Sequence, residues 1–241
     1  LTAAATAALL AFSGTAHAGV VSYVANLVDI NNLGASGVAT LDYDDMANTL
    51  AVNIQASGLP ENMIHVQHIH GLVDGMGNAA ESNTPTIAQD MAGDNDGVIE
   101  LGEGATVYGP ILLSLSDPAG LDPLGSEGGF PLAPGGVIDF SFTYDLNDPT
   151  IFAGAFGVDQ LLPLVMREIV IHGGFLAQGQ GANGGEADGT GGFKATLPVL
   201  AGEIEAIPLP GAAALLLTGL AGFPFMRRRN KDRAAKTVSA S

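Results

Sequence analysis

Apolar and polar residues alternate in short runs along most of the chain, and turn-forming residues separate these runs. Side chains on a β-strand point alternately to opposite faces, so the pattern is typical of strands with one buried face. Helical periodicity is weak and predicts only one short helix, Val158–Leu164, which Pro163 limits. Such spacing favours an all-β fold, an antiparallel sandwich or barrel, over alternating strands and helices. The predicted strands are Val20–Leu27, Gly37–Tyr43, Thr49–Ala56, Ile64–His70, Ile111–Leu115, Val137–Tyr144, Arg167–His172 and Lys194–Glu205.

Residues 19–206 have a length suited to one domain with a sizeable core. Two predicted connections in this domain are long: Gly71–Gly109, which carries many carboxylates, and Gly173–Phe193, in which glycine dominates. Connections of this length inside a compact domain are usually functional or disordered.

The charge of the chain is strongly negative, with a formal net value of −17. Within residues 19–206, 24 carboxylates accompany only two basic residues, Arg167 and Lys194, which gives −22. A surface of this charge repels phosphate backbones, so we expect no nucleic acid partner, and it suits cations, calcium included. Because the chain contains no cysteine, its stability must come from packing or from bound ions.

The first 18 residues predict a secretory signal peptide. Thr2–Phe12 is apolar and rich in alanine, and Ala16-His17-Ala18 fits a cleavage site of the small-x-small type. We expect cleavage between Ala18 and Gly19, and export of the remaining chain.

The C-terminal region predicts a membrane helix and a short basic tail. Residues 207–226 are predominantly apolar and about long enough to cross a bilayer, and the basic segment 227–241 should stay on the cytoplasmic side. The region resembles the VPLPA subclass of bacterial PEP-CTERM sorting tails, although Gly211 stands where that subclass usually has alanine. The resemblance implies recognition by an exosortase and delivery to the cell surface; the alternative is an ordinary membrane anchor. The motif residues are Pro208, Pro210, Arg227, Arg228 and Arg229.

Three of the five histidines fall within six positions, in His65-Val66-Gln67-His68-Ile69-His70. On a strand, His68 and His70 share one face and His65 points to the other. His172 stands at the end of a later predicted strand, just before two glycines. Three neutral imidazoles with an open or carboxylate-filled fourth position suit copper or zinc. The alternative is that these are polar strand residues hydrogen-bonded to loop backbone.

Several motifs together resemble two related families. Gly37-Val38-Ala39-Thr40-Leu41, Leu50, Ser57-Gly58-Leu59 and His68-Ile69-His70-Gly71 are similar to the CHRD (chordin-type) domain. The same histidine strand, Arg167–His172 and Gly191–Gly202 look like the Cu/Zn superoxide dismutase superfamily. Both resemblances imply an antiparallel Greek-key β-sandwich or barrel. The dismutase resemblance implies that His68, His70 and His172 are copper ligands.

The sequence also departs from the dismutase pattern. No histidine occurs between Gly71 and Ile171, so the bridging imidazole and the zinc-site histidines have no counterparts. Ala201 replaces a family cysteine, and Pro198 replaces the arginine that guides superoxide. We therefore expect an exported surface or matrix protein with a binding or structural role, with extracellular polysaccharide or matrix proteins as partners. The alternative is a copper-dependent oxidoreductase related to dismutases.

An acidic segment around Gly97 resembles a calcium-binding EF-hand loop. When Gly97 is aligned with the glycine of that loop, Asp94, Asp96 and Glu103 fall at ligand positions. Ala92 then occupies the first ligand position, where Asp90 could substitute with a shifted geometry, and no flanking helices are evident. The alternative, a solvated acidic turn, is the interpretation that the sequence favours.

Overall fold

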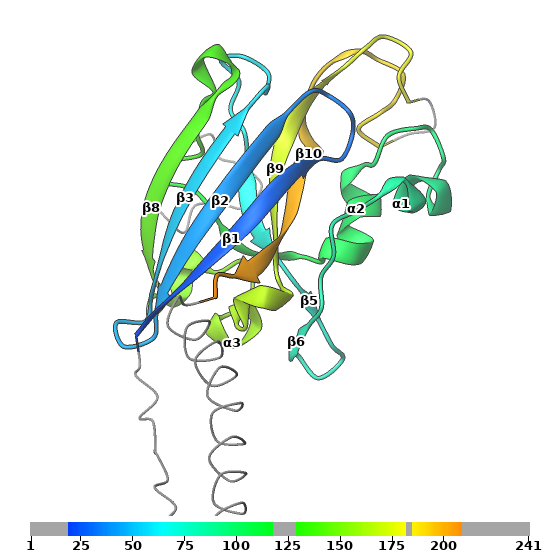
Figure 1. Ribbon diagram of the computed structural model, residues 1–241. Coiled ribbons are helices and arrows are strands. Elements are labelled where there is room, and N and C mark those ends of the chain that lie inside the picture. The colour runs from blue at the N-terminus through cyan, green and yellow to red at the C-terminus, as the bar shows by residue number, and fades with distance from the viewer. Residues whose placement is uncertain (1–18, 118–128, 182–184, 209–241) are drawn as a thin grey trace, which may run out of the picture.

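The computed structural model describes residues 19–117, 129–181 and 185–208. These residues form an antiparallel eight-stranded sheet in the order β7-β4-β9-β10-β1-β2-β3-β8. The sheet curls into an open half-barrel, with β1, β2, β3 and β8 on one side and β9 on the other (Figure 1). The strands are β1 (Val20–Asp29), β2 (Ser36–Asp44), β3 (Thr49–Ser57), β4 (Gln67–His70), β7 (Ile111–Ser114), β8 (Ile138–Asp145), β9 (Glu168–Leu176) and β10 (Gly192–Ala206).

The predicted all-β class is confirmed, and each of the eight predicted strands is present. The ends differ most in β4, which begins at Gln67, and in β9, which does not end at His172 but continues to Leu176. Strand β3 shows why the pattern was informative. Leu50, Val52 and Ile54 are fully buried, and the residues between them are more exposed. These side chains face the interior of the curl and join the main hydrophobic core.

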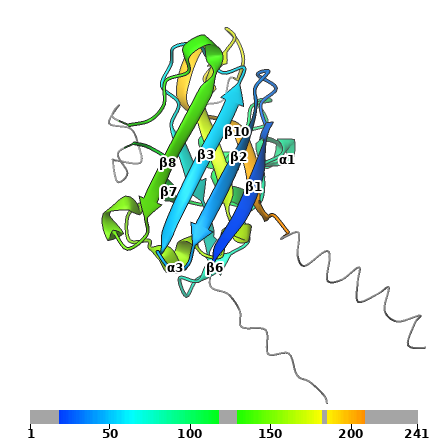
Figure 2. The same ribbon diagram turned by 60° about the vertical axis from the view of Figure 1, so that its left-hand side comes forward.

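Strand β10 connects the two sides of the curl. Its first part pairs with β9 and its last part with β1, and register shifts interrupt the pairing with β9 between Lys194 and Leu200. Irregularities of this kind bend a strand and increase its twist. The long strand therefore belongs to both sides of the curl, and in the turned view it lies behind β1, β2 and β3 (Figure 2).

The connection between β4 and β7 is structured, which the sequence did not predict. It contains the strands β5 (Leu72–Val73) and β6 (Ala79–Ala80) and the helices α1 (Ile87–Ala92) and α2 (Leu101–Tyr108). The expectation of a single short helix was therefore wrong. The predicted helix is present as α3 (Val158–Leu161), which ends before Pro163. Three 3₁₀ turns complete the description: η1 (Pro134–Gly136), η2 (Pro149–Ile151) and η3 (Leu164–Met166).

The helical connection covers the outer face of β9. Nearly every residue of β9 is buried, whereas a strand with one solvated face would alternate. Ile169 and Ile171 join the main core, while Val170 packs with Tyr108 of α2 and Ala201 in a separate cluster. Sheet strand β9 is therefore enclosed between the interior of the curl and the connection.

Buried Arg167, at the start of β9, anchors this covering connection. Its side chain is fully buried and donates hydrogen bonds to backbone carbonyls of Leu72, Ala80 and Leu161 at 2.9 to 3.2 Å. One side chain thus ties the β5–β6 hairpin and α3 to the sheet.

The predicted signal peptide, residues 1–18, lies outside the described residues, and so does nearly all of the predicted membrane segment 207–226 with the tail 227–241. Among the residues that the structure does describe, no helix combines the length and the apolar character needed to cross a membrane. The described chain begins and ends close together, because Tyr23 of β1 pairs with Ala206 of β10 (Figure 1).

Candidate metal centre

Three histidines predicted as metal ligands meet on the outer face of the sheet. Strands β4 and β9 are neighbours, and His68 lies opposite Val170, two residues before His172. The side chains of His68, His70 and His172 are each only 2 % exposed. One ring nitrogen from each lies within 4.8 Å of the others. The prediction that His172 approaches the pair across 102 residues of sequence is confirmed.

Aromatic side chains from outside the sheet enclose the histidine cluster. The ring centre of Tyr108 lies 4.5 Å from that of His70, and the ring centre of Phe130 lies 5.5 Å from that of His68. The three imidazole centres lie 5.5 to 5.8 Å apart. The cluster is therefore compact and removed from bulk water.

Backbone carbonyls fix the orientation of two of the rings. His70 Nδ1 lies 2.9 Å from the carbonyl oxygen of Gly109, and His172 Nδ1 lies 2.8 Å from that of Thr196. Because a carbonyl only accepts a hydrogen bond, Nδ1 carries the proton in both rings, and Nε2 carries the lone pair. Both Nε2 atoms are buried and have no hydrogen-bond partner among the residues that the structure describes. The alternative of polar strand residues bonded to loop backbone accounts for Nδ1 but leaves both Nε2 atoms unexplained.

Gly109 suits its role as acceptor because of its backbone conformation. Its φ is +83°, which side chains other than glycine rarely adopt. A Cβ at this position would lie 2.5 Å from the backbone of Gly71. The backbones of Gly109 and Gly71 therefore lie close together, and the carbonyl oxygen of Gly109 lies next to the His70 ring.

Burial keeps two of the imidazoles neutral. It lowers the pKa of His70 from 6.5 to about 3, and the neighbouring His172 adds to this effect. Burial likewise lowers the pKa of His172 to about 4. Neutral imidazole is the form that binds metal ions, so these residues need lose no proton to coordinate at neutral pH.

The geometry fits one ion bound by three nitrogens. Nitrogens bound to zinc lie about 2.0–2.1 Å from it, which places tetrahedral ligands roughly 3.4 Å apart. Since the three ring nitrogens lie within 4.8 Å of one another, small side-chain rotations would bring them to that separation. A donor Nδ1–H held by a carbonyl, with Nε2 toward the ion, is the usual outer-shell support for a metal-binding histidine.

His65 lies apart from this cluster, as the alternation of side chains predicted. It is fully buried, with Nδ1 2.9 Å from the carbonyl oxygen of His172 and Nε2 3.1 Å from that of Pro60. Its ring therefore supports the backbone at His172.

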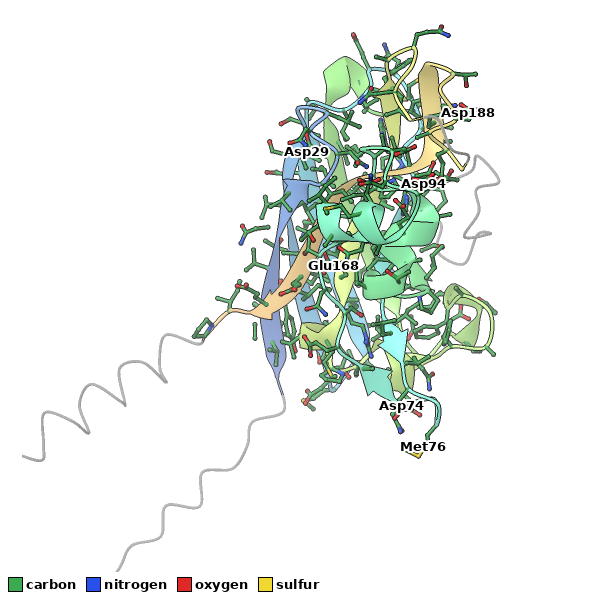
Figure 3. The ribbon with its side chains drawn as sticks, turned by 90° about the vertical axis from the view of Figure 1, so that its right-hand side faces the viewer. Asp29, Asp74, Met76, Asp94, Glu168 and Asp188 are labelled. Carbon is green, nitrogen blue, oxygen red and sulfur yellow. The ribbon has the colours of Figure 1, made fainter. Side chains whose placement is uncertain are left out.

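Glu168 is a buried acid near the cluster that the sequence did not single out. It lies opposite His70 in the pairing of β4 with β9, in the middle of the molecule (Figure 3). It is fully buried, and its Oε1 accepts a 2.6 Å hydrogen bond from the Thr84 hydroxyl. Burial raises its pKa from 4.5 to about 8, so it is mostly protonated at neutral pH. The sequence does not show that Glu168 lies close to His70, because this depends on the register between β4 and β9.

The acidic loop forms a second group that could hold a cation. Oxygens of Asp90, Asp94 and Asp96 lie within 4.8 Å of one another, and the loop lies beside the helices (Figure 3). The sequence expectation of no flanking helices was wrong, since α1 precedes the loop and α2 follows it. Glu103 does not belong to this group; its carboxylate accepts hydrogen bonds from the backbone of Asp94 and Glu100. Asp90 does belong to it, as expected for the residue that could substitute for Ala92 at the first ligand position.

The fold and the site together define a curled antiparallel β domain with a buried cluster of three histidines. No protein-family model matches the sequence, and no curated protein matches it either. The function is therefore argued from the site itself.

Proposed function

We propose that this protein holds one copper or zinc ion through His68, His70 and His172. The proposal rests on the buried Nε2 atoms of His70 and His172, which have no hydrogen-bond partner in the described part of the chain, while Nδ1 of each ring is bonded to a carbonyl. Leaving buried polar atoms unsatisfied costs free energy, about 1–3 kcal/mol for each group. An ion shared by the three rings would satisfy these atoms.

The chemistry of the ligands supports copper or zinc. Imidazole suits both metals, while magnesium and calcium prefer oxygen ligands. Copper binds more tightly than zinc in the general order of affinities. Because the group contains no carboxylate, three neutral nitrogens would leave the ion with a net positive charge and one position open. In a domain without disulfides, a bound ion would also stabilise the fold.

The setting of this centre, in our proposal, is the bacterial cell surface. The support is the sequence: a signal peptide at 1–18, a membrane segment at 207–226 and a basic tail at 227–241 in the arrangement of PEP-CTERM proteins. An exosortase would be the sorting partner. Both segments would join the domain at neighbouring strand ends, those of β1 and β10.

The β domain would act as a binding or structural component in the envelope or extracellular matrix, with polysaccharide or matrix proteins as partners. The support is the motif resemblance to CHRD domains and to the Greek-key fold of dismutases. The acidic loop adds calcium as a candidate second cation, with Asp90, Asp94 and Asp96 as its oxygen donors.

A copper-dependent dismutase-like oxidoreductase is the second candidate function. It is favoured by the meeting of the three histidines that the resemblance aligns with copper ligands. A superoxide assay on the copper-loaded protein separates the two: a matrix component gives no turnover above free buffer, whereas an oxidoreductase gives turnover that His70→Ala abolishes.

Elemental analysis after metal loading tests the centre. The wild-type protein should retain one copper or zinc ion per chain after desalting, and His70→Ala should lose it. The matched control is Val52→Ala, which changes a buried side chain of β3 in the core inside the curl and should retain the ion. Equal metal content in wild type and His70→Ala would reject the site.

A further inference from the structure

A cavity of about 450 Å³ opens beside the histidine cluster. His68 and His172 line its inner part, and Phe130, Phe193 and Leu101 form apolar walls. Leu132, which is 54 % exposed, lies at its solvent side. Ligand sites in proteins have volumes of about 300–1,000 Å³, so this cavity has room for a small organic molecule.

The lining of the cavity is nearly free of polar side chains. Among the described residues that line it, none is charged, and apart from the two imidazoles only Asn62 and Thr196 have polar side chains. This is notable in a domain with a formal charge of −22 over residues 19–206. Moving a charged group into such surroundings without a partner is costly. The cavity therefore disfavours anions and favours uncharged, largely apolar molecules.

His172 connects the cavity to the proposed metal centre. It lines the cavity, it is 2 % exposed, and its Nε2 has no hydrogen-bond partner within residues 19–117, 129–181 and 185–208. Since the three imidazoles supply only three ligands, a fourth position remains for a donor atom that enters from outside the protein. The cavity adjoins the side of the cluster that His68 and His172 form.

We propose that this cavity binds a small uncharged molecule with an apolar, preferably aromatic, body and one nitrogen or oxygen donor atom that completes the coordination of the ion. This inference rests on the proposed metal centre and adds the class of ligand to it. The apolar body packs against Phe130, Phe193 and Leu132, and the donor atom lies at the side of His68 and His172.

Two matched probes test the class of ligand on the full chain loaded with cobalt(II), whose visible spectrum reports a change of coordination. 4-Phenylimidazole and 4-(4-carboxyphenyl)imidazole share the donor nitrogen and the ring system and differ by one carboxylate. We expect the uncharged probe to bind at least about tenfold more tightly, because the carboxylate must enter or approach an apolar cavity. Equal or tighter binding of the charged probe would overturn the proposal.

A variant at the rim locates the binding. Leu132→Asp places a charge at an exposed lining position and should weaken 4-phenylimidazole about tenfold while cobalt content stays unchanged. Val165→Asp is the control, because Val165 is 43 % exposed and does not line the cavity. Equal affinity in both variants would place the probe elsewhere and overturn the proposal.

The two proposals fail in different ways. If the protein takes up none of cobalt, zinc and copper, the metal centre is wrong and the ligand inference falls with it. If it holds one cobalt per chain and neither probe changes the spectrum, the centre stands and the ligand inference alone is wrong.

Discussion

Glu168 makes the stability of the domain depend on pH in a calculable way. Its side chain is fully buried, and burial raises its pKa from 4.5 to about 8. The folded protein therefore holds a proton that the unfolded chain releases between these values. Because the unfolded chain binds fewer protons in that window, the contribution of Glu168 to stability is complete below pH 4.5 and is lost as the pH rises toward 8.

The magnitude follows from the shift. One pKa unit corresponds to about 1.36 kcal/mol, so the loss amounts to roughly 3–5 kcal/mol between pH 4.5 and 8. Glu168→Gln keeps the shape and cannot ionise, so this loss should disappear. We expect the variant and the wild type to have similar stability at pH 4.5, and the variant to be more stable by about that amount at pH 8.

Urea unfolding of the metal-free protein, followed by circular dichroism from pH 4.5 to 9, measures this difference. The control is Glu205→Gln, which changes an exposed glutamate on β10; its stability should follow the wild type at every pH. Ionisation of His70 and His172 affects all three proteins equally and cancels in the comparison. A stability difference between Glu168→Gln and wild type that stays constant with pH would refute the reasoning.

Three further predictions concern the cation sites. Because the pKa values of His70 and His172 are about 3 and 4, zinc affinity measured by competition with a chelator should change little from pH 7 to 5 and fall below about pH 4; a midpoint near 6.5 would contradict this. Gly109→Ala should lower the free energy of unfolding in urea by about 1–3 kcal/mol and should weaken zinc binding. Unchanged zinc affinity would show that the Gly109 carbonyl does not support His70 as a ligand. Calcium should raise the Tm of wild type and of Asp139→Asn, an exposed control, but not of Asp96→Asn; no rise in wild type would leave the loop a solvated turn.

The strands were predictable because their signal is local. In β3, alternation of buried Leu50, Val52 and Ile54 with more exposed residues specifies both the strand and its inner face. The sequence pattern did not predict α1 and α2, and the reason is physical. α1 has only six residues, α2 contains Gly102 and Gly104, and neither shows a long apolar stripe. α2 is positioned by its contacts with β10 and with Val170 of β9, and α1 by its contacts with α2. Thr86 and Glu103 cap the two helices, and periodicity reveals none of these contacts.

The histidine centre was predictable in part. The spacing of His68 and His70 specified their common face. His172 was a candidate because its strand was expected to end there, and that reason was wrong, since β9 continues to Leu176. The supports could not be foreseen, because the acceptors are the backbone carbonyls of Gly109 and Thr196, which have no sequence signature. The oxygen donors of the acidic loop were foreseen except that Glu103 caps backbone amides, a choice that depends on where α2 begins.

Nuclear magnetic resonance of the protein with ¹⁵N-labelled imidazoles gives the decisive test of the metal centre. Without metal, His70 and His172 should show a protonated Nδ1 and an unprotonated Nε2 at neutral pH. One equivalent of zinc should shift the Nε2 resonances of both rings and one nitrogen of His68, and leave His65 unchanged. Unshifted Nε2 resonances at one equivalent, or zinc bound instead to Nδ1 of His70 and His172, would contradict the proposed centre.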